Sequence, residues 1–523
     1  MSTVLRGAEP TTIAILVGSV YVTYHLALLF YRSRSRPLSR MPGPKRVSWL
    51  YGSVPAKDAT DEVALFLEES WLREYGPTFK VFSNLGAQLL YTVDTLALKH
   101  ILSRGDIYYK SEVLRYYLGR MLGKGLLIVD GEEHKQQRRV MNPAFGPMQV
   151  HRFTGLFVEK SNEMTDAWLK LCSQTTRQDG KLRLDAFAWL NKTTLDIIGL
   201  AGFHYDFDSL NAPDEHPNVL NEAPTARHSG TAKAQETIRT IGMKLITEKK
   251  AAILASHATA GDAVKRKDFE GYDLLTLLIK SNMASDLPES ARMTDDEILA
   301  QVPTFIVAGH ETTSTAVAWA LFAMSCFRDV QNKLRAELRT LSTDTPTEAE
   351  LTSLTYLDHV VREILRLHPP VYGTSRVAER DDVIPLREPY TDIDGVVHHE
   401  IHVRKGDFIN IPIMPVHRRA EIWGDDAHDP ERWENIPDAV KDIPTVWGNL
   451  MTFVAGQHSC IGYRFAIIEM KALLFSIVRS FEFELGVSPA DIVSKTMVVT
   501  RPTIASHTSA GAQLPLVIWP VKA

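Results

Sequence analysis

Phe453-Val454-Ala455-Gly456-Gln457-His458-Ser459-Cys460-Ile461-Gly462 is the stretch of this 523-residue chain that decides its fold. Cys460 lies just before the run Tyr463 to Lys471, whose composition and spacing predict a helix. A helix N-terminus stabilises an anion through its free N–H groups and its dipole, so a cysteine there is readily deprotonated. The thiolate is the form that binds a metal, while Gly456 and Gly462 remove side chains where a flat cofactor would press on the backbone. The stretch therefore predicts a cysteine that binds the metal of a flat cofactor.

A second segment places polar side chains inside an apolar run. The spacing of its apolar residues predicts one long helix over 295–327. Within this helix, Ala308 and Gly309 are small enough to leave room for a diatomic ligand. The carboxylate of Glu311 and the hydroxyl of Thr312 are suited to order water and deliver protons to such a ligand. The structural alternative is a helix whose threonines donate to the carbonyls one turn earlier.

These two segments resemble the Phe-x-x-Gly-x-x-x-Cys-x-Gly haem-binding loop and the Ala/Gly-Gly-x-Asp/Glu-Thr-Thr/Ser oxygen-activation motif of the cytochrome P-450 superfamily. The resemblance implies a haem b cofactor with Cys460 as the axial ligand of its iron, because a thiolate ligand favours cleavage of the O–O bond. It also implies catalytic roles for Glu311 and Thr312. The other residues that the two motifs place at the cofactor are Phe453, Gly456, Ala308 and Gly309.

The resemblance further implies partners for the two haem propionates. His134 and Arg138 lie four residues apart, hence on one helix face, and match the family's Trp/His-x-x-x-Arg pattern. Arg376 stands where the family usually has another propionate partner. His458 occupies a position that is usually Arg, so we expect a hydrogen-bond donor whose charge depends on pH.

A third motif has an expected structural role. Glu363 and Arg366 lie three residues apart on one helix face, in a run that ends at Pro369-Pro370. Such pairs are common and individually weak evidence. With Arg432, which follows later, they resemble the family's Glu-x-x-Arg pair and the arginine that completes a buried triad. The resemblance implies that this triad holds the cysteine loop.

Composition excludes several other classes of protein. The formal net charge of −5 leaves no basic surface for nucleic acid, and 45% hydrophobic with 23% charged residues is ordinary for a globular chain. The three cysteines, Cys172, Cys326 and Cys460, are too few and too scattered for a disulfide framework. The apolar run before Cys326 predicts that this residue is a small buried hydrophobe. One large domain is expected, because no linker divides the chain after residue 60.

The N-terminal residues predict a membrane anchor. Residues 11–31 contain no charge and are strongly apolar, and about 20 such residues cross a hydrocarbon core of about 30 Å. The arginines that follow at once place the N-terminus in the lumen and the rest of the chain in the cytosol. A cleaved signal peptide is the alternative. The expected parts are a luminal N-terminus, transmembrane anchor and basic stop over 1–36, a proline-rich hinge over 37–60, and a haem-thiolate monooxygenase domain over 61–523.

The remaining patterns predict a mainly α-helical fold with a small β-sheet. Two β-rich runs, over 78–82 and 87–93, flank a short turn and are typical of a hairpin. Apolar residues recur at helical spacing over 185–205, 235–255, 270–282, 295–327, 356–368 and 463–482. This pattern agrees with the cytochrome P-450 fold that the resemblance implies, preceded by an N-terminal transmembrane helix.

The resemblance implies a membrane-anchored monooxygenase of the fungal microsomal type, in the endoplasmic reticulum membrane with its catalytic domain in the cytosol. Electrons from NADPH would arrive through NADPH-cytochrome P-450 reductase, with cytochrome b5 as a second donor, and O2 would be the other co-substrate. The exposed face of Lys135 and Arg139 either helps to dock an acidic reductase or is an ordinary solvated face.

The expected substrate is an apolar small molecule. The pocket should be lined by Phe305, Ala308, Val371, Tyr372 and residues near Tyr116. Hydroxylation in fungal secondary metabolism, such as terpenoid biosynthesis, is the expected context. Two alternatives stay open at this point: a haem-thiolate isomerase or dehydratase that uses no O2, and a non-catalytic haem-binding protein.

Overall fold

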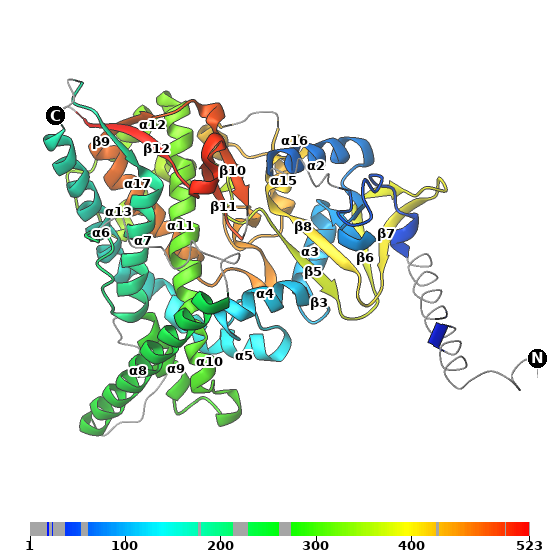
Figure 1. Cartoon of the computed structure of the whole chain (residues 1–523), viewed down its shortest axis with the longest axis horizontal. Coiled ribbons are helices and arrows are strands. Elements are labelled where there is room, and N and C mark those ends of the chain that lie inside the picture. Colours follow the sequence, from blue (N-terminus) through cyan, green and yellow to red (C-terminus); the bar gives the residue numbers. More distant parts are fainter. Residues whose placement is uncertain are drawn as a thin grey trace, which may run out of the picture.

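Helices dominate the protein, as predicted, and most of them gather at the end of the molecule that carries the C-terminus (Figure 1). The computed structural model describes residues 18–19, 24, 37–53, 61–175, 179–212, 228–260, 273–424, 428–496 and 498–521. The helices are α2 Asp61–Tyr75, α3 Thr95–Ser103, α4 Glu112–Leu122, α5 Gly131–Met141, α6 Pro147–Gln174, α7 Ala186–Phe203, α8 His228–Ala260, α9 Leu274–Met283, α10 Asp295–Leu299, α11 Gln301–Cys326, α12 Arg328–Leu338, α13 Glu348–Ser353, α14 Thr355–Leu367, α15 Ile413–Arg418, α16 Ala420–Trp423 and α17 Tyr463–Ser480.

The strands form small sheets. They are β1 Thr78–Phe82, β2 Gln88–Thr92, β3 Tyr108–Tyr109, β4 Leu182–Asp185, β5 Gly373–Ala378, β6 Asp382–Thr391, β7 Val397–Val403, β8 Phe408–Pro412, β9 Phe481–Leu485, β10 Ile492–Thr496, β11 Thr500–Ile504 and β12 Pro515–Pro520. A five-stranded sheet has the order β1-β2-β8-β5-β3, and β4-β12-β9 form a second sheet. The pairs β6-β7 and β10-β11 are separate antiparallel ribbons.

The predicted hairpin is confirmed and forms one edge of the five-stranded sheet. β1 and β2 are antiparallel, with Phe79 opposite Tyr91. Both side chains are buried, and their rings stack with the centroids 4.6 Å apart. Positive φ angles of 58° at Leu85 and 73° at Gly86 reverse the chain between the two strands. An aromatic cross-strand pair therefore fixes the register of this edge.

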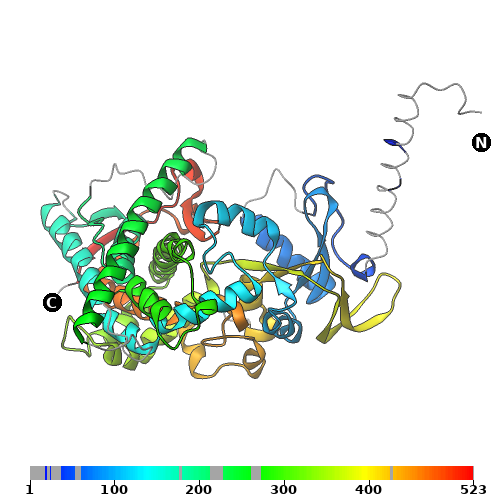
Figure 2. The same ribbon diagram turned by 90° about the horizontal axis from the view of Figure 1, so that it is seen from below.

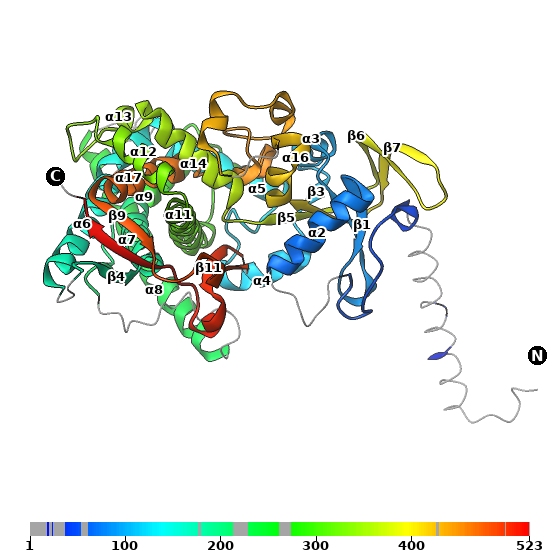
Figure 3. The same ribbon diagram turned by 90° about the horizontal axis from the view of Figure 1, so that it is seen from above.

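α11 is the central helix of the fold and is seen nearly end-on, surrounded by other elements, in Figures 2 and 3. It packs against both α7 and α17. A Cβ atom added at Gly309 would lie 2.6 Å from Cγ1 of Ile198, so only glycine allows α7 to approach this closely. The Thr194 hydroxyl on α7 donates to the His310 carbonyl at 3.1 Å. These contacts hold α7 against the polar segment of α11.

The predicted long helix over 295–327 is divided in two. A capping box between Thr294 and Glu297 starts α10, and the helix is interrupted at Ala300 before α11 begins. Ala300 has φ −65° and ψ −17°, close to the values of a 3-10 turn, so the backbone stays helical across the interruption. The side-chain amide of Gln301 fixes the junction between α10 and α11. Its Nε2 donates to the Glu297 carbonyl at 2.9 Å, and its Oε1 accepts from the Leu126 N–H at 3.0 Å.

The prediction that Cys326 is buried is wrong. Cys326 is the last residue of α11 and is exposed, because the helix leaves the core at this end. Cys172, by contrast, is buried on the apolar face of α6. Apolar neighbours in sequence therefore did not reveal which residue of the last helical turn faces solvent.

The hinge segment packs on the domain in its described part. Leu38 and Met41 are each only 1% exposed, and the Lys80 N–H donates to the Pro42 carbonyl at 2.9 Å. Apart from residues 18–19 and 24, the predicted anchor lies outside the described residues. None of the helices in the described part of the chain combines the length and the hydrophobicity that a membrane span requires.

Candidate active site

A cavity of about 360 Å³ lies between α11 and the loop before α17. It collects residues that are far apart in the sequence, from α4, α5, α7, α9, α11 and β5 as well as this loop. Most of its lining side chains are apolar, among them Leu114, Leu118, Leu126, Leu127, Phe145, Ile198, Phe305, Val371, Ala466 and Met470. The cavity therefore suits a largely apolar guest.

The expected substrate-contact residues are partly found at this cavity. Phe305, Ala308 and Val371 line it, and Leu114 and Leu118 flank the predicted position at Tyr116. The prediction for Tyr372 is wrong. Its hydroxyl donates to Glu68 at 2.7 Å, so the ring is held against α2 and not in the cavity.

Cys460 lies in the wall of the cavity at the position that the sequence predicted, just before the N-terminus of an 18-residue helix. The Cys460 N–H donates to the Phe453 carbonyl at 2.8 Å, which closes the loop. Phe453 itself is buried and also lines the cavity. The loop thus presents one sulfur atom to an enclosed space.

The electrostatic environment of this sulfur opposes a free thiolate. The side chain is exposed to the cavity, but protein surrounds it otherwise, and this burial raises the pKa of the Cys460 thiol. The Gly462 N–H and the Arg138 guanidinium act in the opposite direction, because each stabilises the anion. A metal cation bound at the sulfur would remove the remaining penalty, since a coordinating thiol is deprotonated.

Arg138 connects α5 to the cysteine loop. Its guanidinium donates to the carbonyls of Gln457 and Ser459 and to the Ser459 hydroxyl, the last at 3.1 Å. The side chain also lines the cavity. The structure therefore places Arg138 where a propionate partner was predicted, and it adds a role in holding the loop that the sequence did not indicate.

The opposite wall of the cavity is the polar segment of α11. Ala308, Gly309, Thr312 and Thr313 all line the cavity. The Thr312 hydroxyl donates to the Ala308 carbonyl at 2.6 Å, which is the structural alternative considered for this helix. Its oxygen still has lone pairs that can accept a hydrogen bond from a molecule in the cavity.

Glu311 does not belong to the described residues that line the cavity. Its carboxylate forms an ion pair with Arg501 of β11, and both side chains are largely buried. A buried cation attracts a nearby carboxylate strongly. The catalytic role expected for Glu311 stays a prediction.

Buried cations and imidazoles form a cationic cluster at one end of the cavity. We define it as Lys110, His134, Arg138, Arg376 and His458, all of which line the cavity. Burial lowers the pKa of Lys110 to about 8 and that of Arg376 to about 10. Asp130 is the carboxylate that lies among them, with Oδ1 3.7 Å from the Lys110 Nζ. Three cations thus face one carboxylate.

Lys110 and Asp130 were not predicted. Lys110 donates to the Val129 carbonyl at 2.7 Å, and its N–H donates to Asp130 at 3.2 Å. No motif spacing connects these residues to the other members of the cluster. The only signal in the sequence was a charged residue directly after Tyr108-Tyr109, a pair that forms strand β3.

The prediction that the charge of His458 responds to pH is corrected by its surroundings. Its ring lies 4.2 Å from that of His134, centroid to centroid. Burial and the nearby cations, Lys110 first, lower the pKa of His458 to about 2, so the ring is neutral near neutral pH. Burial lowers the pKa of His134 to about 3 for the same reasons.

Gly456 has a second, steric reason to be glycine that the sequence did not indicate. It has a φ of 72°, and a Cβ atom there would lie 1.9 Å from the Leu102 carbonyl oxygen of α3. The position therefore requires glycine because the loop packs on α3. Gly456 is not among the described residues of the cavity wall, and its contact with a cofactor stays a prediction.

These observations fit a group with an apolar body and anionic ends. Neither ring nitrogen of the buried His458 makes a hydrogen bond among the described residues, although Nε2 lies 3.3 Å from the Asp130 Oδ1. A buried imidazole nitrogen without a hydrogen bond is rare in proteins and indicates a ligand. Three cations against one carboxylate leave room for added negative charge, which the two propionates of a haem would supply. The cationic cluster, the apolar walls and one cysteine sulfur together match the parts of a haem.

Comparison with known proteins decides the family. The model of the family described as Cytochrome P450 matches residues 41–508. The chain belongs to the cytochrome P450 family. Cytochrome P450 monooxygenase 205 of Postia placenta is 48% identical over 515 residues, covering 92% of this chain and 93% of the relative. Cytochrome P450 monooxygenase 128 of the same fungus is 44% identical over 539 residues, covering 96% of each.

A more distant relative agrees with this assignment. Cytochrome P450 monooxygenase claP of Ampulloclitocybe clavipes is 34% identical over 528 residues, with 93% of this chain and 94% of the relative covered. The chain is therefore a monooxygenase. Members of the cytochrome P450 family bind haem through a cysteine thiolate, and Cys460 is the cysteine at the cavity. The cationic cluster would hold the propionates.

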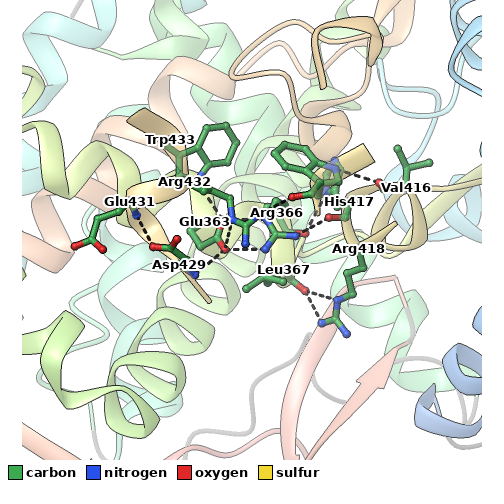
Figure 4. Close-up of polar contacts among 11 residues, drawn as sticks. Glu363, Arg366, Leu367, Val416, His417, Arg418, Asp429, Glu431, Arg432 and Trp433 are labelled. Atoms are coloured by element: carbon green, nitrogen blue, oxygen red, sulfur yellow. Dashed lines mark hydrogen bonds and ion pairs between the residues drawn. The ribbon is translucent and has the colours of Figure 1, made fainter. Parts of the chain in front are cut away.

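A buried ion cluster behind the cysteine loop has the composition that the sequence predicted (Figure 4). Glu363, 1% exposed, accepts from Arg366 at 2.7 and 2.9 Å and from Arg432 at 3.2 Å. The indole N–H of Trp433 donates to the same carboxylate at 3.1 Å. One carboxylate thus connects α14 to the segment over 429–433.

His417 extends this cluster to the cysteine loop. The Arg366 guanidinium donates to the His417 carbonyl at 2.8 Å, and the His417 Nε2 accepts from the Met451 N–H at 2.7 Å. Met451 lies two residues before Phe453, at the start of the loop. The Thr452 hydroxyl adds a bond to the Leu365 carbonyl at 2.8 Å. The structure therefore connects the triad to the cysteine loop through a neutral imidazole.

The first prediction concerns Glu363. Replacing it by glutamine is expected to lower the free energy of unfolding by about 3–5 kcal/mol, because Arg366 and Arg432 would stay buried without an anion. Denaturant unfolding measures this change. The matched control is Glu431→Gln, which removes the exposed partner of Lys333 and should change stability by less than about 1 kcal/mol. Equal effects of the two substitutions would contradict the buried role.

The second prediction concerns pH and His417. Burial lowers the pKa of His417 from 6.5 to about 3, so between these values the unfolded chain binds a proton that the folded chain does not. Stability must therefore fall as the pH falls below 6.5. At pH 5 this group accounts for a loss of about 2 kcal/mol. Denaturant unfolding at pH 7.5 and pH 5 measures this loss in the free energy of unfolding. The loss should be smaller by about 2 kcal/mol in His417→Gln. The control is His399→Gln, at an exposed position, which should lose as much stability as the wild-type protein.

Proposed function

We propose that this chain is a haem b monooxygenase that inserts one oxygen atom of O2 into an apolar small molecule, with hydroxylation as the product-forming step. The observation that carries the proposal is the shared cavity. The Cys460 sulfur faces it from the loop before α17, and Ala308, Gly309 and Thr312 face it from α11. Mainly apolar side chains line the rest, which favours a substrate of the same character.

The residues have separate roles in this proposal. Bound haem supplies the activation of O2 with electrons from NADPH. Cys460 would hold the iron as a thiolate, stabilised by the Gly462 N–H and Arg138, while Arg376 and Lys110 would hold the propionates. Thr312 orders water at the opposite wall.

Glu311 needs a rearrangement before it can act as an acid in this scheme. Its carboxylate is paired with Arg501, so it reaches the cavity only after it leaves that partner. Such a change would expose the carboxylate to the water that Thr312 orders. Arg501, which the motif does not contain, therefore controls whether the acid of the motif is free.

The proposal places the enzyme in the endoplasmic reticulum membrane, with residues 11–31 as a single-pass anchor and the catalytic domain in the cytosol. NADPH-cytochrome P-450 reductase would deliver the electrons, with cytochrome b5 as a second donor. The similarity to fungal monooxygenases supports a substrate from fungal secondary metabolism, such as a terpenoid. The apolar cavity is consistent with that class.

The third prediction tests thiolate ligation and turnover. The reduced, carbon monoxide-bound protein should show the Soret maximum of a thiolate ligand, and Cys460→Ala should lose it. Cys326→Ala is the matched control, because that residue is exposed at the end of α11 and should leave the spectrum unchanged. NADPH-dependent product formation with a reductase separates a monooxygenase from an isomerase. Binding spectra across a library of apolar compounds would then identify the substrate class.

The fourth prediction tests Thr312. Replacing it by alanine should raise the amount of hydrogen peroxide released per product, because ordered water at the α11 wall would be lost. The control is Ser314→Ala, since Ser314 is buried, bonds Asn191 at 2.6 Å and is not at the cavity. Unchanged coupling in the Thr312 variant would remove this residue from the proton path.

A further inference from the structure

Two buried glutamines that no functional motif includes connect α5 to α11. Gln137 lies on α5 and Gln301 is the first residue of α11, and both are 0% exposed. The Gln301 Nε2 donates to the Gln137 Oε1 at 3.1 Å and to the Glu297 carbonyl at 2.9 Å. The side-chain oxygen and nitrogen of both glutamines are all hydrogen-bonded. A buried polar network whose members are all bonded is rigid and favours one arrangement of the segments it joins.

This glutamine pair holds the loop over 123–130, which joins α4 to α5. The Gln301 Oε1 accepts from the Leu126 N–H at 3.0 Å, and the Gln137 Nε2 donates to the Lys124 carbonyl at 3.0 Å. Two backbone groups of one short loop are thus bonded to the side chains of two different helices.

The loop lies in direct contact with the junction of α10 and α11. A Cβ atom at Gly125 would lie 2.6 Å from the Thr304 Oγ1 and 2.7 Å from the Ala300 carbonyl oxygen, so only glycine allows the backbone to approach this closely. At Gly123 a Cβ atom would lie 3.3 Å from that of Ala300. This close approach brings the loop within reach of the Gln301 side chain.

Lys110 holds the same loop from the side of the cationic cluster. Its ammonium donates to the Val129 carbonyl at 2.7 Å and to the Leu126 carbonyl at 3.4 Å. An ammonium group has three donors, so one of them remains for an anionic guest of the cavity. The glutamine pair carries no charge and does not line the cavity among the described residues, so its contacts with the loop do not depend on such a guest.

The loop presents two leucines to the cavity. Leu126 and Leu127 both line it. Leu126 is also the residue whose N–H is bonded by Gln301, so the bond that fixes the backbone also fixes where its side chain meets a guest. A wall that is already rigid before binding costs a guest less ordering entropy than a mobile one.

We propose that Gln137 and Gln301 are positioning residues that give the cavity its preference among apolar guests, because they fix Leu126 and Leu127 as a rigid part of its wall. The proposal rests on the assignment of this cavity to the substrate of a monooxygenase. It adds two residues that touch neither the substrate nor the cofactor and act through the loop.

Two imidazoles of different length test this role in the holoenzyme. Both 1-methylimidazole and 1-octylimidazole bind haem iron through the same ring nitrogen and shift the Soret band, and only the octyl chain adds extensive contact with the apolar walls. Gln301→Leu leaves the Leu126 N–H and the Gln137 Oε1 buried without a partner, so the loop loses its fixed position. The affinity for 1-octylimidazole should fall about tenfold, the loss of about two buried methylene contacts, while that for 1-methylimidazole stays unchanged.

Gln331→Leu is the matched control. Gln331 is 3% exposed and its Nε2 donates to the Met324 and Phe483 carbonyls, each at 3.1 Å, but it is not among the described residues at the cavity. Its replacement also removes buried hydrogen bonds, and the ratio of the two imidazole affinities should keep its wild-type value. An equal change of this ratio in Gln301→Leu and Gln331→Leu would show a general loss of stability and overturn the proposal.

Gln137→Leu tests whether the two glutamines act as one unit. It removes two of the hydrogen bonds and leaves those of Gln301 to Glu297 and Leu126, so it is also the milder variant for folding. It should lower the affinity ratio in the same direction, and the double variant should lower it no further than Gln301→Leu alone. Independent, multiplying effects would contradict a shared network.

Leu127→Ala tests the end of the path and leaves both glutamines in place. Leu127 is 39% exposed, so its truncation leaves little of the core unfilled. The variant should weaken 1-octylimidazole and leave 1-methylimidazole unchanged, and equal binding of 1-octylimidazole by the variant and the wild-type protein would overturn the proposal. The Soret maximum of the carbon monoxide complex should be the same in every variant. That spectrum reports on the thiolate separately, so the monooxygenase assignment stands or falls independently of the glutamine pair.

Discussion

The burial of one cysteine sulfur is the constraint on which the rest of this structure depends. Cys460 faces a cavity while protein surrounds it elsewhere, and burial raises the pKa of its thiol. The Gly462 N–H and the Arg138 guanidinium favour the anion, and a metal ion would complete that stabilisation. The loop must therefore be held rigidly, and Arg138 and the Glu363 cluster supply that rigidity from two sides.

The cavity likewise contains buried polar groups that a bound ligand would stabilise. Its cationic cluster contains more positive than negative charge, and the ring nitrogens of His458 make no hydrogen bond among the described residues. Burial of unpaired charge is costly, so these side chains are arranged for an anionic guest and not for the stability of the empty fold. Apolar side chains line most of the remaining cavity wall.

Local patterns predicted well wherever the relevant partners are close in sequence. The Cys460 loop, the helix after it and the hairpin of Phe79 and Tyr91 depend on turns and on periodicity, and all are found. The Glu363 to Arg366 pair is likewise local. A prediction failed where a distant segment decides the outcome. Glu68 of α2 binds the Tyr372 hydroxyl, and Tyr372 does not line the cavity.

The sequence by itself determined the family, the helical class of the fold and the cysteine that faces the cavity, because each depends on residue types at fixed short spacings. Only the tertiary structure decided which cations gather at the cavity and which histidines stay neutral. Those properties depend on burial and on electrostatic interactions between segments up to hundreds of residues apart. Lys110 and His458 are ordinary titratable residues in the printed sequence, and it is the low polarity around them that changes their pKa values.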